Sequence, residues 1–164
     1  MAASIKKHPL HPMLVPFPIA LWIFSLVSDL IVVLGLGGPV WKDVAFYTMA
    51  GGFVGALAAA APGYLDYRSL TDSQTSNIAW WHMVINLSIV GLFAVNIIWR
   101  VNSEAASTLP VILSIAGVSM LGISGWLGGE LVYVHGVGVD RPRDGGEKSG
   151  YSKGSAMSHT RTGT

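Results

Sequence analysis

Four long apolar segments occupy most of this chain and constrain its fold more than any other feature. They cover about residues 13–36, 44–62, 78–99 and 109–134. An α-helix needs about 20 apolar residues to cross the hydrocarbon core of a bilayer, where no water is present to satisfy backbone amides. The segments therefore predict four transmembrane helices. Their short connections predict an all-α fold, an integral membrane up-down-up-down four-helix bundle.

The composition supports a membrane protein and excludes several other classes. Hydrophobic residues make up 51% of the 164 residues and charged residues only 12%, whereas soluble domains have roughly 25% charged residues. The predicted partner is the lipid bilayer. No basic stripe lies outside the termini, so nucleic acid is not an expected partner. Cysteine is absent, which excludes disulfides, thiolate metal sites and covalently attached c-type haem.

The two ends of the chain differ in character. Lys6 and Lys7 precede an apolar run that is too long for a cleaved signal peptide and has no small-residue cleavage site. The first segment is therefore expected to remain as a membrane helix. After Val139 the composition changes to Asp, Arg, Gly, Lys, Ser and Thr. Residues 140–164, which include His159, are expected to form a mobile polar tail.

The distribution of lysine and arginine predicts the orientation in the membrane. One side of the four predicted spans carries five such residues near the membrane and the other side carries two. An excess of positive charge marks the cytoplasmic side. The chain is thus expected to be a multi-pass membrane protein with both termini cytoplasmic. The five residues are Lys6, Lys7, Arg68, Arg141 and Arg143, and the two are Lys42 and Arg100.

Small residues recur every four positions in the second and fourth segments. The second segment contains Gly51, Gly55, Ala59 and Gly63; the fourth contains Gly125 with Gly129 and Ser124 with Gly128. Such stripes allow helix backbones to approach closely in lipid, and close packing is the favoured interpretation. A cleft lined by glycine is the alternative. Most tryptophans lie near span ends, but Trp126 is a candidate for the bundle interior.

Asp29 is an ionisable residue inside the first span, and such residues are costly in a membrane. Asn96 in the third span lies at a similar depth, with Ser25 and Ser28 nearby. The favoured interpretation is a structural hydrogen bond between Asp29 and Asn96. The alternative is a carboxyl group that carries protons.

Histidines from distant parts of the sequence are expected to meet at one membrane face. His8 and His11 precede the first span, His82 lies about one turn inside the third, and His135 closes the fourth. Because successive spans cross in opposite directions, all four positions fall on the same side. Histidine is the commonest metal ligand, and bundles build cofactor sites from facing helices. This convergence is the main functional indication in the sequence.

The His8-Pro9 and His11-Pro12 pairs disfavour α-helix at both histidines, since a residue before proline avoids that conformation. A non-helical segment that lines a cavity is tolerated at the membrane surface. Such a segment would turn His8 or His11 toward His82. Met13 and Met83 are softer candidate ligands nearby.

The preferred functional hypothesis is electron transfer through a b-type haem, whose potential its axial ligands set. The expected ligands are His82 and His135, with His11 as a substitute. Asn86 follows His82 by one helical turn and so shares its face, where it would either form a hydrogen bond to another helix of the bundle or tune the group that His82 binds. Asp66 and Glu130 would then be linked to proton movement.

Two further hypotheses remain open. The histidines can bind zinc, copper or iron directly, because imidazole suits these metals. The candidate ligands are His82, His135, His11 and His8, with Asp66 or Glu130. Alternatively, the chain is a cofactor-free accessory or scaffold subunit of a larger membrane complex, or a homo-oligomer. No phosphate loop, nucleotide fingerprint or nucleophile–base pair is present, which argues against an independent hydrolase or kinase.

Several motifs resemble a family of bacterial membrane proteins known as domain of unknown function 2231. They are HPLHPMLVPFPIAL from His8 to Leu21, GYLD from Gly63 to Asp66, Trp81-His82, and SGWLGGELVYVHGVG from Ser124 to Gly138. The resemblance covers about residues 8–139. It implies a four-helix membrane domain with these histidines among its signature positions. Some family members carry a histidine where this chain has Pro16.

Overall fold

The computed structural model describes residues 4–5, 8–103 and 108–139. The sequence-predicted polar tail therefore lies outside the described residues. A short antiparallel pair joins Ser4–Ile5 (β1) to His8–Pro9 (β2), with Ile5 opposite His8. The helices are α1 (Leu10–Leu14), α2 (Pro16–Val33), α3 (Val40–Arg68), α4 (Ser73–Asn102) and α5 (Leu109–Tyr133).

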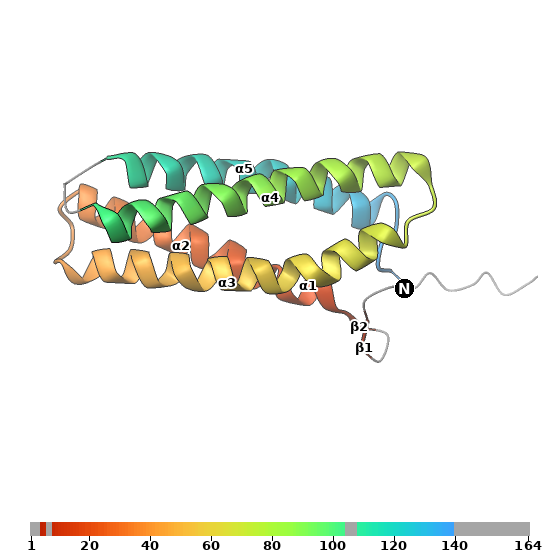
Figure 1. Ribbon diagram of the computed structural model, residues 1–164, viewed down its shortest axis with the longest axis horizontal. Helices are drawn as coiled ribbons and strands as arrows, with labels where there is room; N and C mark the ends of the chain where they lie inside the picture. Colours follow the sequence, from red (N-terminus) through yellow and green to blue (C-terminus); the bar gives the residue numbers. More distant parts are fainter. Residues whose placement is uncertain (1–3, 6–7, 104–107, 140–164) are drawn as a thin grey trace, which may run out of the picture.

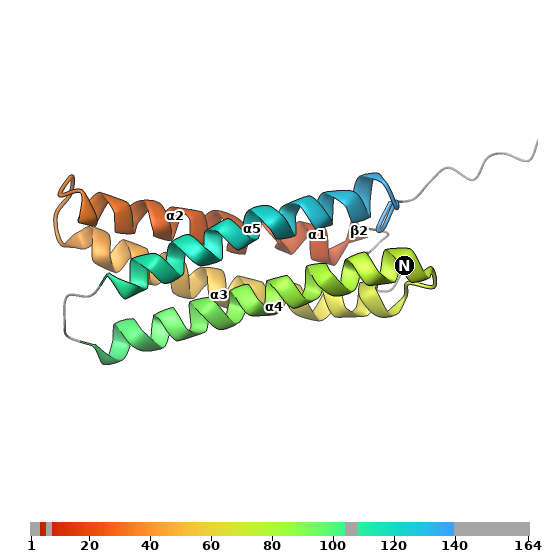
Figure 2. The same ribbon diagram turned by 90° about the horizontal axis from the view of Figure 1, so that it is seen from above.

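The long helices form an all-α bundle, as the sequence predicts. Figure 1 shows α2, α3, α4 and α5 side by side, with successive helices joined at alternate ends. The closest neighbours are α2 with α3 and α4 with α5, and the two pairs meet through α3–α4 and α2–α5 contacts. Figure 2 shows these two pairs from above. That the bundle crosses a bilayer in this up-down order stays a prediction.

Four helical stretches are long and apolar enough to span a membrane, and α1 and α2 together make the first of them. Both α3 and α4 extend beyond the predicted spans into more polar sequence. Local signals explain their limits. Gly35 adopts φ +67° after α2, and the amide of Leu36 donates to the carbonyl of Ile31, which closes the helix end. Asp72 caps α4 by accepting from the amide of Thr75 at 2.8 Å.

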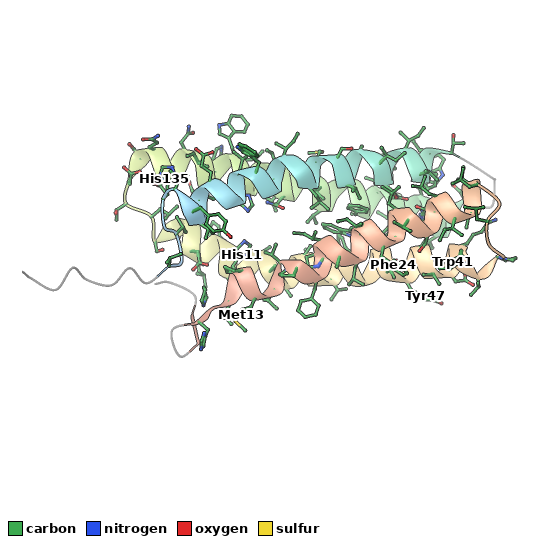
Figure 3. All side chains as sticks on the ribbon, turned by 180° about the vertical axis from the view of Figure 1, so that it is seen from behind. His11, Met13, Phe24, Trp41, Tyr47 and His135 are labelled. Atoms are coloured by element: carbon green, nitrogen blue, oxygen red, sulfur yellow. The ribbon has the colours of Figure 1, made fainter. Side chains whose placement is uncertain are left out.

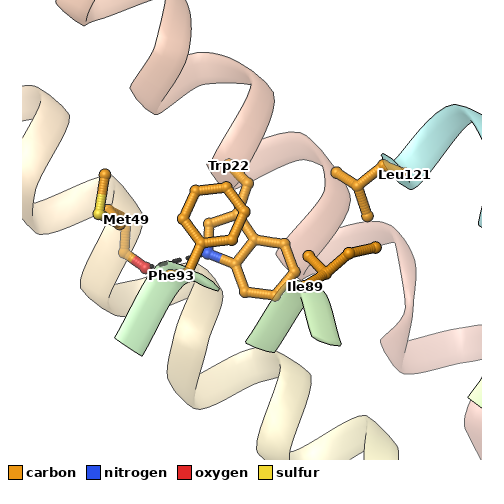
Figure 4. Packing of buried hydrophobic residues seen from close by; sticks show 5 residues of the cluster. All are labelled: Trp22, Met49, Ile89, Phe93 and Leu121. Atoms are coloured by element: carbon orange, nitrogen blue, oxygen red, sulfur yellow. Dashed lines mark hydrogen bonds between the residues drawn. The ribbon is translucent and has the colours of Figure 1, made fainter. Parts of the chain in front are cut away.

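An apolar core occupies the middle of the bundle (Figure 4). It consists of Trp22, Met49, Ile89, Phe93 and Leu121, drawn from all four long helices. The Trp22 and Phe93 rings stack with centroids 4.3 Å apart and planes 8° apart. The indole Nε1–H donates to the carbonyl of Met49 at 3.2 Å, which satisfies the one polar atom of this side chain. The core thus joins both helix pairs at mid-depth.

The small-residue stripe of α3 packs against α1 and α2, as expected. A methyl group added at Gly51 or Gly55 would touch Leu21 or Pro18 at 3.4 Å. At Gly52, beside the stripe, it would lie 2.6 Å from the Trp22 ring, too close for any side chain. These glycines therefore let the α2 and α3 backbones approach closely.

The two stripes of α5 behave differently. Ser124 is buried and Gly128 faces His82, whereas Gly125 and Gly129 face open space. Trp126 is 78% exposed, so the expectation that it reaches the interior is wrong. The rotation of α5 about its own axis explains both observations. The face that carries Ser124 and Gly128 is turned toward α4, and the neighbouring face, with Gly125, Trp126 and Gly129, is turned outward.

A buried polar cluster lies toward the end of the bundle where α2 and α4 finish. The Arg100 guanidinium binds both carboxylate oxygens of Asp29, at 2.6 and 3.0 Å. Its Nε–H donates to Asn96 Oδ1 at 2.9 Å, and the Asn96 amide donates to Ser114 and to the carbonyl of Pro110. Arg100 therefore bridges Asp29 and Asn96, which the sequence had paired directly.

Removing one member of this ion pair should destabilise the bundle strongly. Arg100→Leu leaves the Asp29 carboxylate buried without its counter-ion, so we expect a loss of about 3–5 kcal/mol in the free energy of unfolding. The double variant Asp29→Leu/Arg100→Leu should recover most of that loss. Unfolding in mixed detergent micelles measures both. The exposed Lys42→Leu change is the control, and an equal loss there would contradict the proposed cause.

Gly52→Ala should also destabilise the protein, because Trp22 is held by its stacking and its hydrogen bond and cannot move aside freely. We expect a cost of about 1–3 kcal/mol, the usual range for overpacking. Gly122→Ala is the matched control, since open space surrounds that position and alanine is the better helix former. Thermal unfolding of both variants tests the difference. Equal effects would contradict the close-packing interpretation.

Candidate functional site

The candidate histidines gather at the end of the bundle opposite the Asp29–Arg100 pair. Figure 3 shows His11, Met13 and His135 there, while Trp41 and Tyr47 lie at the far end. His8 belongs to β2 at the same end and is exposed. The site lies where α1, the end of α3, the beginning of α4 and the end of α5 come together (Figure 1).

His11 lies on α1, although its His-Pro pair predicted a non-helical conformation; that prediction is wrong for His11 and holds for His8. Pro12 falls in the first turn of α1, where a helix needs no internal amide donor. The His11 Nδ1–H donates to the carbonyl of Ala59 on α3 at 2.8 Å. Pro62, inside α3, has no amide N–H, so the carbonyl of Ala58, next to Ala59, lacks its usual helical donor.

Gly63 makes room for this imidazole. A Cβ atom there would lie 2.7 Å from Nδ1 of His11. The last member of the α3 stripe therefore serves the site as well as helix packing. Because the same stripe of small residues both packs against a helix and leaves space for a histidine ring, its four-residue spacing alone could not distinguish close helix packing from a cleft lined by glycine.

His82 lies on α4, and hydrogen bonds to the neighbouring helix α5 hold its ring in place. Its Nδ1–H donates to the carbonyl of Ser124 at 3.0 Å. The Asn86 amide lies 3.2 Å from Nε2 of the same ring and donates to the Ser124 hydroxyl at 2.6 Å. Gly128 faces the ring, and a Cβ atom there would be 3.1 Å from Cε1. Both ring nitrogens of His82 therefore have partners.

His11 and His82 face each other across the two helix pairs. Their ring centroids are 6.5 Å apart and the ring planes make an angle of 87°. Each ring is only partly buried. Among the sequence-predicted ligands, these two are brought into ring contact, although they lie on α1 and α4.

His135 occupies a different position at the same end. Gly136 follows it with φ +67°, so the chain turns after α5. The His135 Nδ1 lies 3.1 Å from the Thr75 hydroxyl, which donates its proton to Asp72 at 2.7 Å. Because that hydroxyl has a single proton, Nδ1 of His135 must be the donor. His82 lies two helical turns from Thr75, roughly 10 Å along α4.

Asp72 completes this second chain of hydrogen bonds. The Thr75 hydroxyl and then the Thr75 amide lower the pKa of the Asp72 carboxyl from its ordinary 3.8, with a smaller contribution from His135. Because the pKa is lowered in the folded protein, the ionised Asp72 cap contributes its full stabilisation of α4 at pH values above the ordinary pKa of 3.8. Its contribution is lost as the pH falls through the lowered pKa.

The three histidines share one tautomer. Each Nδ1–H donates to a group that can only accept or whose proton is already used, namely Ala59 O, Ser124 O and the Thr75 hydroxyl. In the neutral form of each ring, Nε2 then carries the lone pair. Histidines that bind a metal usually donate their other ring N–H to a carbonyl or similar acceptor, which fixes the ring orientation. The His11 and His82 rings already have this arrangement.

The other candidate ligands lie farther from this ring pair or at the surface. Met13 is 57% exposed. Met83, Asp66 and Glu130 are half-buried on α4, α3 and α5. Within the described part of the chain, no group of three or more His, Asp or Glu residues is placed to hold a metal ion.

Sequence reasoning missed several residues of the site. Ser124, Thr75, Gly63 and Gly128 each contact a histidine, but only the small-residue stripes marked three of them as interior positions. Thr75 carried a different signal, because a threonine three residues after a helix-capping Asp belongs to the first helical turn. None of these signals shows which histidine is contacted.

Comparison with known proteins identifies the family. No curated protein matches the chain, and no solved structure matches it. The family model described as "Predicted membrane protein (DUF2231)" matches residues 7–141, which include α1 to α5 and all the histidines of the site. The chain therefore belongs to the DUF2231 family of membrane proteins.

Proposed function

We propose that this protein transfers electrons in the membrane through a b-type haem held between His11 and His82. One observation carries the proposal. The two imidazoles come from opposite helix pairs, face each other at 6.5 Å, and both donate Nδ1–H to main-chain carbonyls. Axial histidines of a haem bind through one ring nitrogen each, while an acceptor holds the other N–H, as Ala59 and Ser124 do for these two rings.

The number of ligands favours haem over a directly bound ion. A zinc site takes three or four protein ligands, whereas the haem macrocycle supplies four nitrogens and leaves two axial positions. Two imidazoles meet here, and the described residues add no third His, Asp or Glu to form a metal-binding group. Bound haem would supply the one-electron chemistry, and the chain would supply its ligands and its apolar surroundings.

The helix arrangement is compatible with a flat group between the two rings. His11 is attached to the α2–α3 pair through Ala59, and His82 is attached to α5 through Ser124. Helices contact each other more extensively within each pair than between the pairs. Separation of the pairs at this end would therefore admit the haem and preserve both histidine anchors. In this proposal His135 does not bind the haem and keeps its hydrogen bond with Thr75.

The proposed location is the bacterial inner membrane, with the histidine end facing the cytoplasm. Arg68 ends α3 at the histidine end. In the sequence, Lys6 and Lys7 precede the first apolar segment and Arg141 and Arg143 follow the last. Of the two basic residues assigned to the other end, Arg100 is paired inside the bundle with Asp29. Lys42 is thus the exposed basic residue there, which strengthens the charge asymmetry.

A cofactor-free accessory subunit of a larger complex, or a homo-oligomer, is the second candidate function. It is favoured by the outward face of α5, where Gly125 and Gly129 have open space and Trp126 projects. Glycine faces of this kind allow close helix association in lipid. The two candidates are compatible, because the α5 face points away from the histidine pair.

A reduced-minus-oxidised visible spectrum tests the haem proposal directly. Protein expressed with ample haem and purified in detergent should show a Soret band and a sharp α-band. His11→Ala and His82→Ala should each lose most of the bound haem, because each removes one axial ligand. His8→Ala is the matched control and should retain the spectrum, since His8 is exposed on β2.

Two results would overturn the haem proposal. A colourless wild-type protein that folds normally and contains no iron would remove electron transfer and favour the accessory subunit. Loss of haem in His135→Ala, with retention in His11→Ala, would assign the ligand pair to His82 and His135.

Cysteine labelling tests the orientation of the protein in the membrane. The chain contains no cysteine, so an introduced thiol is the only labelling site. Gly38→Cys and Thr71→Cys place single thiols in exposed loops at opposite ends of the bundle. With the histidine end cytoplasmic, a membrane-impermeant maleimide should label Gly38→Cys in intact spheroplasts. It should label Thr71→Cys only after lysis. The reverse pattern would contradict the proposed orientation.

A further inference from the structure

The Asn86 side chain has more acceptors than protons. Its nitrogen lies 2.6 Å from the Ser124 hydroxyl, 2.7 Å from the His82 carbonyl and 3.2 Å from Nε2 of His82. A carbonyl can only accept, so the amide nitrogen rather than the amide oxygen faces this group. The amide has two N–H groups for three acceptors. The longest of the three contacts, the one to Nε2, is therefore the weakest.

This excess gives Asn86 a specific relation to the ligand site. If Nε2 of His82 binds another group, both Asn86 protons still have acceptors in Ser124 and the His82 carbonyl. If Nε2 binds nothing else, Asn86 donates to its lone pair in this partly buried site, where an unsatisfied polar atom is costly. Asn86 therefore keeps an acceptor for each of its two N–H groups when a ligand replaces its contact with Nε2.

We infer that Asn86 is a positioning residue, a displaceable cap that occupies Nε2 of His82 in the ligand-free protein and yields it to an incoming ligand. The inference rests on the proposed function for its ligand, haem, but the cap itself is a property of the ligand-free chain. The Ser124 hydroxyl is the second part of the device, because it is the acceptor to which the displaced amide stays bound.

Two substitutions should move hemin affinity in opposite directions. Asn86→Leu removes the cap and leaves the lone pair open, so hemin should bind about fivefold more tightly, the equivalent of one ordinary hydrogen bond. Ser124→Ala removes the competing acceptor, together with the 3.2 Å contact of the hydroxyl to Nδ1 of His82, but keeps the main-chain carbonyl that accepts from Nδ1 at 3.0 Å. The amide then bonds Nε2 more fully, and hemin should bind more weakly. Ser88→Ala is the control, because Ser88 is exposed and bonds only its own helix, at Val84.

Nitrogen NMR of the haem-free protein gives a second readout that needs no ligand. With ¹⁵N-labelled histidine, the Nε2 resonance of His82 should move downfield in Asn86→Leu, as expected for a lone pair that has lost its donor. It should move upfield in Ser124→Ala. The Nδ1 resonance should remain that of a protonated nitrogen in both variants.

The results separate the cap from the haem proposal. The cap is supported if Nε2 moves as expected, even when the wild-type protein binds no hemin, and that combination overturns only the proposed function. An Nε2 resonance that neither variant moves overturns the cap. So does a change of hemin affinity in the same direction for both variants, since loosening of the fold alone would produce it. If Asn86→Leu does not fold, the Ser124→Ala shift decides.

Discussion

The hydrocarbon core contains no water, and the structure follows from the need to satisfy every buried polar group within the protein. Within the described residues, each buried side-chain nitrogen or oxygen has a hydrogen-bond partner. The chain meets this demand in two places. Asp29 and Arg100 neutralise each other toward one end, and histidines donate to carbonyls at the other. The Asp29–Arg100 cluster joins one helix pair to the other, whereas the histidine hydrogen bonds lie within each pair, so polar satisfaction fixes the contacts both between and inside the pairs.

Backbone geometry, more than side-chain partners, determines the state of the histidines. Ala59 and Ser124 hold the two facing rings through their carbonyls, which no substitution at these positions removes. Gly63 and Gly128 leave the space that the rings fill. The same device recurs in the apolar core, where Gly52 and Gly117 lie against Trp22 and Phe93. Each of these four glycines therefore leaves space for one aromatic or imidazole ring.

The sequence predicts the helices and the end at which the histidines meet, because both depend only on segment length and on the alternation of direction. The sequence does not predict which two histidine rings contact each other. Arg100 looked like a flanking charge, since hydropathy ignores that a long side chain can reach back to Asp29 in the bundle. The sequence favoured His135 over His11 as the partner of His82, whereas the structure turns the chain at Gly136 and places the His135 ring against the Thr75 hydroxyl. Helix rotation, which also turns Trp126 outward, depends on contacts between helices that no single segment encodes.

The stacked Trp22–Phe93 pair lies between the two polar clusters, together with Ile89 and Leu121. A proton moving along the bundle would have to leave its last acceptor at one cluster and cross this layer without a hydrogen-bond partner. Such a crossing is costly in an apolar medium. This layer separates the two polar clusters along the bundle. If the proposed electron transfer takes place at the histidine end, the layer would keep the accompanying charge change from dissipating an ion gradient across the bilayer.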